Sequence, residues 1–244
     1  MVATLSATFY WYWHLKKKHL RPEVALDIGI LGMLSGVIGA RIFHILVEAP
    51  AYYWEKPFRV FEFWRGGFVS WGAFLALALS FFVYCHIRKL PLLLYLDSFA
   101  TAAPLIKFFV RVACLLTGCC YGKPTHVPWA ITFTNPASTA YYYYPNTPLH
   151  PTQVYSMIHA ALLFAFVNWF YEHRSTYQGQ TICVLVMGWA LPRALIEFFR
   201  GDSDRGVYFH DLISTGQIMG FSIFLIALIV FIYLNTKQKP THGT

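Results

Sequence analysis

The sequence predicts an all-α, polytopic membrane protein with about seven transmembrane helices. Apolar residues make up 57% of the 244 residues, charged residues make up only 12%, and the mean hydropathy is +0.48. This balance is far from that of soluble globular domains. Apolar stretches also recur along the whole chain, and most approach the roughly 20 residues that a helix needs to cross a bilayer.

The predicted spans follow one another with short connections, so we expect one membrane domain over residues 1–244. In chain order the spans cover residues 1–15, 25–47, 67–87, 92–117, 152–171, 181–199 and 215–234. The first is short, but no small-residue cleavage site follows it, which argues against a removed signal peptide.

Two longer connections carry irregular sequence. Residues 48–66 are rich in aromatic and charged side chains, which suits a segment at the level of the lipid headgroups. Residues 121–151 contain a run of tyrosines and several prolines, and we expect them to fold over the outer mouth of the helix bundle.

The distribution of lysine and arginine predicts the orientation in the membrane. The densest cluster is Lys16, Lys17 and Lys18, directly after the first span. Positively charged loops stay in the cytoplasm, so we expect the N-terminus outside and the C-terminus inside. Anchoring to anionic lipid explains much of the net charge of +8, and no nucleic-acid partner is expected.

The five cysteines do not have the spacing of a disulfide framework or of a zinc site. Cys119 and Cys120 are adjacent, and a disulfide between neighbours would be strained. With Cys114 they form C-x4-C-C, which differs from the usual zinc spacings. The spacing of the cysteines therefore predicts no metal site.

Buried cations are the main sign of function. Four basic side chains lie within or at the edge of the predicted spans, namely Arg41, Lys107, Arg111 and Arg193, whereas only two acidic side chains lie comparably deep, Asp97 and Glu197. Such residues can pair across helices to fix packing. Pairing leaves a surplus of positive charge here, however, and a charge inside a membrane usually marks a functional site. We therefore predict an anion site, with a lipid phosphate as its natural ligand.

Glycines follow Arg111 at the outer end of the fourth span. Gly118 and Gly122 stand before Pro124, and this composition permits a tight turn. Two interpretations are open. The turn brings backbone N–H groups close to a phosphate, or it simply ends the helix.

Several longer motifs, in order, resemble the prolipoprotein diacylglyceryl transferases. They are G-A-R at 39–41, W-R-G-G-F-V-S-W-G at 64–72, D-S-F-A-T-A-A-P at 97–104, R-V-A-C-L-L-T-G-C-C-Y-G-K-P-T-H-V-P-W-A-I-T-F at 111–133, H-P-T-Q-V-Y at 150–155, R-A-L-I-E-F-F-R at 193–200 and I-S-T-G-Q at 213–217. The resemblance covers nearly the whole chain, and seven spans is also the count of that family.

The resemblance implies a bacterial inner-membrane enzyme with no metal or organic cofactor. Members of the family move the diacylglyceryl group of phosphatidylglycerol to the thiol of a lipoprotein cysteine and release glycerol phosphate. The implied partners are phosphatidylglycerol or another anionic phospholipid, and prolipoprotein signal peptides in the bacterial membrane.

The resemblance also implies site residues. Arg111 and Arg193 match arginines that hold the phospholipid headgroup, and Glu197 and Arg200 match the acidic residue and the arginine that follows it. With His150 as a candidate base, the predicted catalytic set is Arg111, Arg193, Glu197 and His150. The predicted substrate-binding set is Arg41, Lys107, Gly118, Gly122, Gln153, Tyr155 and Arg200.

Three departures from the family pattern place the chain in a divergent branch. The family's histidine falls on Trp71, its asparagine on Cys114 and its closing glutamate on Ser156. An indole N–H cannot accept a proton, so another base is required. The candidates are His150, Glu197 and His126, although His150 is also suited to orienting its loop.

Other hypotheses remain open. Cys114 lies near Arg111 and could act as a nucleophile with a lowered pKa. His44 and His159 lie on apolar faces, where histidines more often serve packing. The acceptor could be a group other than a lipoprotein cysteine, since the altered positions are those on the acceptor side. The chain could also be a non-catalytic relative that binds anionic lipid or lipoprotein. The third hypothesis is a channel or transporter, and it ranks last because the sequence has no internal repeat.

Overall fold

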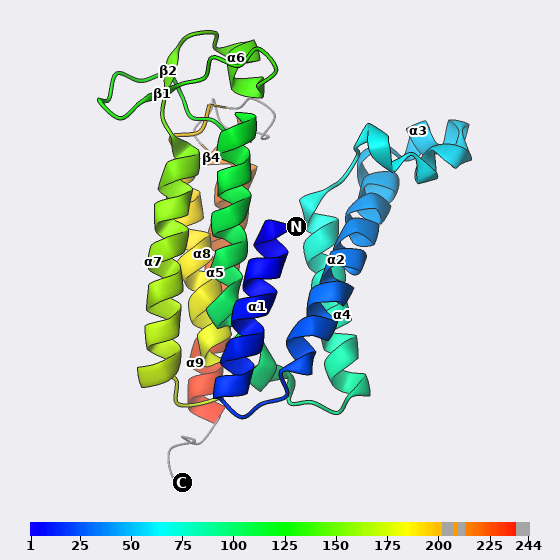
Figure 1. Cartoon of the computed structure of the whole chain (residues 1–244), viewed down its shortest axis with the longest axis vertical. Helices are drawn as coiled ribbons and strands as arrows, with labels where there is room; N and C mark the ends of the chain where they lie inside the picture. Colours follow the sequence, from blue (N-terminus) through cyan, green and yellow to red (C-terminus); the bar gives the residue numbers. More distant parts are fainter. Residues whose placement is uncertain (202–206, 209–212, 238–244) are drawn as a thin grey trace. The chain divides into compact units, whose positions relative to one another are not determined.

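The computed structural model describes residues 1–201, 207–208 and 213–237, and most of these residues are helical. The long helices are α1 (Val2–Lys17), α2 (Glu23–Phe43), α4 (Ser70–Ile87), α5 (Leu92–Thr117), α7 (Thr152–His173), α8 (Gln180–Glu197) and α9 (Thr215–Lys237). A helix thus covers each of the seven predicted apolar stretches (Figure 1).

Five helical segments in the described part of the chain are long and apolar enough to cross a membrane. They are Glu23–Glu48, Leu92–Thr117, Thr152–His173, Gln180–Glu197 and Gly216–Lys237, and the apolar helix Trp71–Ile87 is shorter. The chain is therefore a polytopic membrane protein.

Short elements fill the two long connections. The first holds the π-helix η1 (His44–Glu48), α3 (Pro50–Glu55) and the 3-10 helices η2 (Pro57–Phe61) and η3 (Phe63–Arg65). The second holds β1 (Ile131–Thr132), α6 (Thr139–Tyr143) and β2 (Pro148–Leu149), and a further pair of strands, β3 (Val207–Tyr208) and β4 (Ile213–Ser214), precedes α9. Both strand pairs are antiparallel.

Several predicted boundaries differ from the observed helix ends by two or three residues, as at the third and the sixth span. The third apolar stretch becomes helical only at Ser70, because Gly66 and Gly67 adopt φ values of +78° and +77°, which a right-handed helix excludes. Helix α8 ends at Glu197, where the chain turns toward Arg200 rather than continuing to residue 199.

The chain divides into two compact units. The N-terminal unit comprises Thr8–Tyr95, and the C-terminal unit comprises Leu96–Thr244 together with Met1–Ala7.

In the N-terminal unit, α2 and α4 pack against each other through small residues. A Cβ on Gly39 would lie 2.5 Å from the carbonyl oxygen of Gly72, so neither glycine can be enlarged without moving a backbone. Ser35 and Ser80 hydrogen bond at 3.2 Å across the same pair of helices. Small residues that allow close backbone approach are typical of helix contacts in membranes. This contact explains the glycines of the G-A-R and S-W-G motifs.

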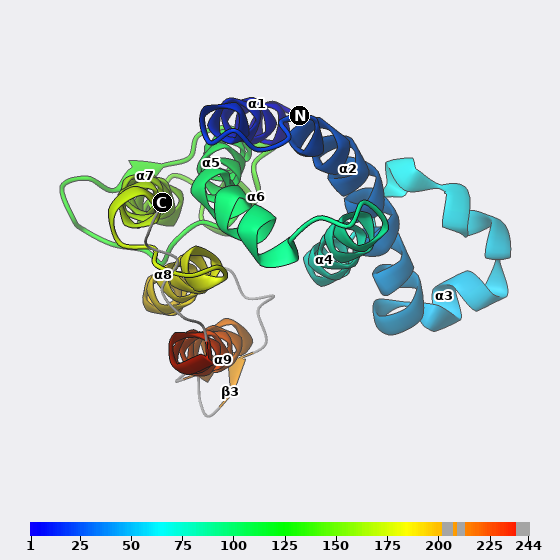
Figure 2. The same ribbon diagram turned by 90° about the horizontal axis from the view of Figure 1, so that it is seen from below.

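In the C-terminal unit, α5, α7 and α8 share one apolar core, and α9 packs on α8 (Figure 2). The core consists of Ala100, Ala103, Leu163, Val167 and Leu185. The connection with β1, α6 and β2 lies beyond the ends of α5 and α7 (Figure 1). The ends of α5 and α8 and the start of α7, which carry or adjoin Arg111, His150, Glu197 and Arg200, therefore meet at one end of this unit.

Candidate active site at the end of the C-terminal unit

A buried carboxylate joins two arginines at the end of α8. Glu197, whose side chain is only 2% exposed, forms an ion pair with Arg193 one helical turn earlier. Arg200, directly after the helix, places Nη1 3.8 Å from the same carboxylate oxygen. Gly216 of α9 faces this carboxylate, and a Cβ there would lie 3.3 Å from it. One buried negative charge is therefore shared by two cations.

Lys107 and Arg111 add two cations from α5. They are four residues apart and share one face of the helix. Electrostatic interactions connect Lys107 with Arg111 and Arg193, and connect Arg193 with Arg111 and Arg200. We call Lys107, Arg111, Arg193 and Arg200 the cation cluster.

Lys107 is held by a chain of contacts that begins at a proline. Pro192 has no N–H, so the carbonyl of Gly188 is left without its helical donor. His159 Nε2 is 2.9 Å from this carbonyl oxygen, and its Nδ1 is 3.0 Å from Lys107 Nζ. The histidine thus donates to Gly188 and accepts from Lys107. The sequence analysis assigned His159 to packing and missed this link. The signal for it is Pro192, which lies four residues after Gly188 and leaves the Gly188 carbonyl open to another donor.

Asp97, the other acidic residue predicted to lie deep in the membrane, forms no ion pair with the cation cluster among the described residues. It is buried and accepts hydrogen bonds from the backbone N–H groups of Gly179 (2.6 Å) and Ile182 (2.8 Å). These groups lie at the start of α8. A carboxylate there accepts hydrogen bonds from N–H groups that have no helical partner, and its charge interacts favourably with the positive end of the helix dipole. Among the described carboxylates, only Glu197 forms an ion pair with members of the cation cluster.

Gly122 is the point where three chain segments cross. Its N–H donates to the carbonyl of His150 at 3.1 Å, and the N–H of Lys123 donates to the carbonyl of Phe199 at 2.8 Å. A Cβ on Gly122 would collide with the backbone and Cβ of His150 and would lie 2.9 Å from the carbonyl oxygen of Phe199. The glycine therefore lets the segment after α5 bind the segments that carry His150 and Arg200.

Gly118 acts differently. It ends α5 with a φ of +67°, and its carbonyl accepts the N–H of Ala140 at 3.0 Å. Left-handed backbone of this kind favours glycine. These contacts are structural, and no contact with a ligand is required to explain this glycine.

His150 belongs to a hydrogen-bonded group at the mouth of a cavity. The Tyr155 hydroxyl lies 3.2 Å from His150 Nδ1 and accepts from Trp129 Nε1 at 2.7 Å. In the tautomer that donates from Nδ1, Nε2 is free to accept a proton. The cavity has a volume of about 760 Å³, and it is lined by Val127, Trp129, Ile131, His150, Pro151, Val154, Tyr155, Ile158 and Phe199.

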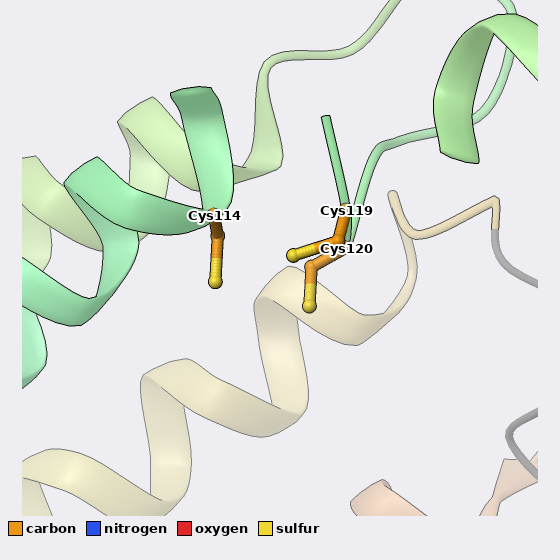
Figure 3. A group of neighbouring side chains, drawn as sticks. All are labelled: Cys114, Cys119 and Cys120. Atoms are coloured by element: carbon orange, nitrogen blue, oxygen red, sulfur yellow. The ribbon is translucent and has the colours of Figure 1, made fainter. Parts of the chain in front are cut away.

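Three thiols lie together beside the cation cluster. The Sγ atoms of Cys114, Cys119 and Cys120 all lie within 4.8 Å of one another (Figure 3). Hydrogen bonds from the thiols of Cys114 and Cys119, together with the charges of Arg200 and Arg111, lower the pKa of Cys120. Sequence spacing did not predict this cluster, because it depends on the turn between α5 and Cys120.

The predicted substrate contact Arg41 lies in the N-terminal unit, where backbone carbonyls occupy its guanidinium. It donates to the carbonyls of Arg59 (2.7 Å), Val60, Glu62, Gly66 and Gly67. The rings of Tyr53, Phe63 and Phe68 lie 5.2 to 5.8 Å from the guanidinium carbon. These contacts hold the 59–67 loop.

Two other predicted site residues support backbone. Gln153 is buried, and its Nε2 donates to the Cys119 carbonyl at 2.8 Å. Ser156, also buried, donates to the carbonyl of Thr152 at 2.8 Å. Trp71 lies in the N-terminal unit, in the first turn of α4, and is 42% exposed.

Comparison with known proteins decides the family. A family model described as prolipoprotein diacylglyceryl transferase matches residues 1–233. The chain belongs to this family. The relatives it resembles are curated as phosphatidylglycerol–prolipoprotein diacylglyceryl transferases.

The similarity to these relatives extends over most of each chain. The protein of Clostridium tetani is 31% identical over 216 residues, which cover 88% of this chain and 83% of the relative. That of Bordetella parapertussis is 28% identical, with 88% and 79% covered. That of Rhodospirillum rubrum is 27% identical, with 95% and 84% covered. The family resemblance inferred from the motifs is thus confirmed, and the protein is a transferase of this family.

Proposed function

We propose that the protein transfers the diacylglyceryl group of phosphatidylglycerol to a cysteine thiol of a prolipoprotein. The family model and the names of the relatives support this reaction. The observation in the structure that carries it is the cation cluster, in which Lys107 and Arg111 face further basic side chains and form no ion pair with a described carboxylate. An anionic headgroup supplies negative charge at this place.

The transfer reaction needs basic groups that bind the phosphate and stabilise the oxygen that leaves with it. The thiol sulfur bonds to a glyceryl carbon, the bond from that carbon to the phosphate oxygen breaks, and glycerol phosphate leaves with the electron pair. Arg111 and Arg193 are suited to gripping the phosphate and stabilising the charge on the leaving oxygen. A fixed cation in a site without water does this better than solvent, because it needs no reorganisation.

The acceptor thiol must lose a proton, and we assign this proton to Nε2 of His150. The hydrogen bond between His150 and Tyr155 holds the ring, and the second ring nitrogen of a neutral imidazole is a proton acceptor. The apolar cavity beside it suits an acyl chain or the apolar part of a signal peptide. A His150→Gln variant that transfers at the unchanged rate would remove this assignment.

The remaining assignments are proposals that rest on the sequence. We place the chain in the bacterial inner membrane as one domain with seven spans, the N-terminus outside and the C-terminus inside. Gly122 and Arg200 position the site, and Lys107, Gln153 and Tyr155 border it.

The test is a transfer assay with the full-length protein in nanodiscs. It uses phosphatidylglycerol labelled in both the glyceryl and the headgroup parts, and a peptide with one acceptor cysteine. We expect peptide lipidation with equal release of glycerol phosphate, and loss of both in Arg111→Ala and Arg193→Ala. Arg174→Ala is the matched control, because Arg174 is an exposed cation that caps α7 and packs on Trp169.

One alternative is a binding protein without turnover. If the wild-type protein binds phosphatidylglycerol but releases no glycerol phosphate, and if Arg111→Ala loses the binding, the alternative is established. Transfer that persists in both arginine variants would contradict the assigned site while leaving the family reaction intact.

A further inference from the structure

We infer that Cys114, Cys119 and Cys120 form a three-thiolate site for a soft monovalent cation, with Cu(I) as the occupant. The site lies outside the transfer reaction, and its argument does not depend on that reaction. It rests on the positions of the three sulfur atoms, on the backbone that fixes them and on the charges around them.

The geometry of the sulfur atoms fits one bound ion. All three Sγ atoms lie within 4.8 Å of one another. A metal–sulfur bond of about 2.3 Å places the sulfurs of a trigonal site about 4.0 Å apart. Small rotations of the side chains are therefore enough to bind. Figure 3 shows the Cys119 sulfur directed toward Cys114, with the Cys114 and Cys120 sulfurs pointing the same way.

The backbone brings two adjacent cysteines to one side. Neighbouring side chains in extended backbone point in opposite directions, but Cys120 has a φ of +55°. A non-glycine residue held in this region is strained, and such residues cluster at functional sites. A disulfide between the neighbours is also strained, so the two thiols favour the reduced form that a metal needs.

Side chains of α7 hold this turn from outside. Thr152 Oγ1 donates to the Cys120 carbonyl at 2.7 Å, and Gln153 Nε2 donates to the Cys119 carbonyl at 2.8 Å. The N–H of Cys119 donates to the carbonyl of Cys114 at 3.1 Å. The three ligands are therefore fixed on packed elements before an ion binds, which reduces the entropy lost on binding.

The surroundings favour a soft ion with three ligands. No other histidine, cysteine, aspartate or glutamate in the described ranges joins the group. Thiolates bind soft ions such as Cu(I) as well as zinc, but structural zinc almost always takes four ligands, so the presence of three favours Cu(I). Three thiolates around one Cu(I) carry two negative charges, and Arg111 and Arg200 interact electrostatically with Cys120. These arginines offset the charge of the loaded site.

The experiment is an anaerobic titration of the full-length protein, reduced and in nanodiscs, with Cu(I) against a chromophoric chelator. We expect one Cu(I) per chain, and a loss of affinity of about 100-fold or more in Cys114→Ser and in Cys120→Ser, because even outer-shell changes cost 10–100-fold. Cys85→Ser and Cys183→Ser are matched controls, since both remove a buried cysteine from another helix.

Two results would overturn the site. The first is unchanged Cu(I) stoichiometry when all three cysteines are serine, and the second is a preference for Zn(II) over Cu(I) in parallel titrations. Alkylation of the wild-type chain gives a test that needs no variant. Saturating Cu(I) should protect all three cysteines at once in peptide mass spectra, and unchanged labelling of Cys119 and Cys120 would refute the proposal.

Discussion

Arg41 and Arg111 are both basic residues near the ends of apolar helices, yet the two units treat them differently. In the N-terminal unit, Arg41 is 4% exposed and donates to five backbone carbonyls. In the C-terminal unit, Arg111 has no hydrogen bond or ion pair to any described residue, and it faces further cations. The first guanidinium has its donors satisfied, and the second has them free.

The difference separates a structural cation from one that waits for a ligand. Carbonyl dipoles spread around a guanidinium satisfy its donors without a counter-ion, so Arg41 stabilises its own loop. Like charges that face one another in a partly buried site raise the free energy of the empty protein. An anion removes that cost only when it binds. The same residue type can therefore serve stability in one unit and function in the other.

The largest expected effect is that of Arg111→Ala. We expect the rate of transfer to fall by about 10²–10³-fold, as for other groups that stabilise developing charge. The free energy of unfolding should stay the same or rise, because the substitution relieves repulsion with Lys107 and breaks no described ion pair. Initial rates and thermal unfolding of the same preparation measure both.

Arg111→Lys sharpens this prediction. It keeps the charge and removes the planar pair of donors, so partial activity would indicate that charge matters more than bidentate geometry. If Arg111→Ala lowers stability and activity in proportion, Arg111 has the same structural role as Arg41, and the comparison fails.

The next effect is that of Arg41→Ala on stability. Removing the guanidinium leaves several carbonyls of the 59–67 loop without donors, and each hydrogen bond to a charged group contributes about 1.5–3 kcal/mol. We expect a loss of about 3 kcal/mol in the free energy of unfolding, and faster proteolysis within residues 56–67. Transfer per folded molecule should change by less than about tenfold.

Arg41→Lys is the control, because it keeps the charge and loses most of the hydrogen bonds. Full stability of Arg41→Ala together with lost transfer would show that Arg41 contacts the lipid, as the sequence predicts.

The sequence predicted the helices well because their signal is local. A stretch such as residues 92–117 is apolar over its whole length, and hydropathy alone reports that. The family motifs also pointed to Arg111, Arg193, Glu197 and Arg200, which the structure brings to one end of the C-terminal unit. What the motifs did not give is which cations have partners in the folded chain.

That information depends on contacts between distant segments. Asp97 is a possible counter-charge in the sequence, but Gly179 and Ile182, more than 80 residues away, use its carboxylate. The three cysteines likewise fail every spacing rule, since a left-handed residue and two side chains of α7 bring the sulfurs together. Sequence patterns report periodicity, whereas these features arise from tertiary packing.

Gly122→Ala tests how the site is positioned. The added methyl group collides with His150, so we expect a loss of about 1–3 kcal/mol in the free energy of unfolding, typical of overpacking. Transfer should fall by about tenfold or more, because a small displacement of catalytic groups is costly. Rates and unfolding of the purified variant measure this.

Gly36→Ala is the matched control. Its nearest neighbour would be the Cβ of Ala73 at 4.0 Å, an ordinary contact, so neither stability nor transfer should fall. Equal effects of both substitutions would mean that Gly122 has no special role in holding His150 and Arg200.

The smallest effect is expected for Asp97→Asn, and it tests the charge balance most directly. Asparagine still accepts a hydrogen bond at the start of α8 but loses the favourable charge at the helix dipole, which contributes about 0.3–1 kcal/mol. We therefore expect a small loss of stability and no change in the affinity for phosphatidylglycerol. If Asp97 instead balanced the cation cluster, its neutralisation would tighten binding of an anionic lipid. A titration with phosphatidylglycerol, with net-neutral phosphatidylcholine as the control lipid, distinguishes the two. Unchanged affinity means that Asp97 does not balance the cation cluster, and tighter binding of the anionic lipid alone would show that it does.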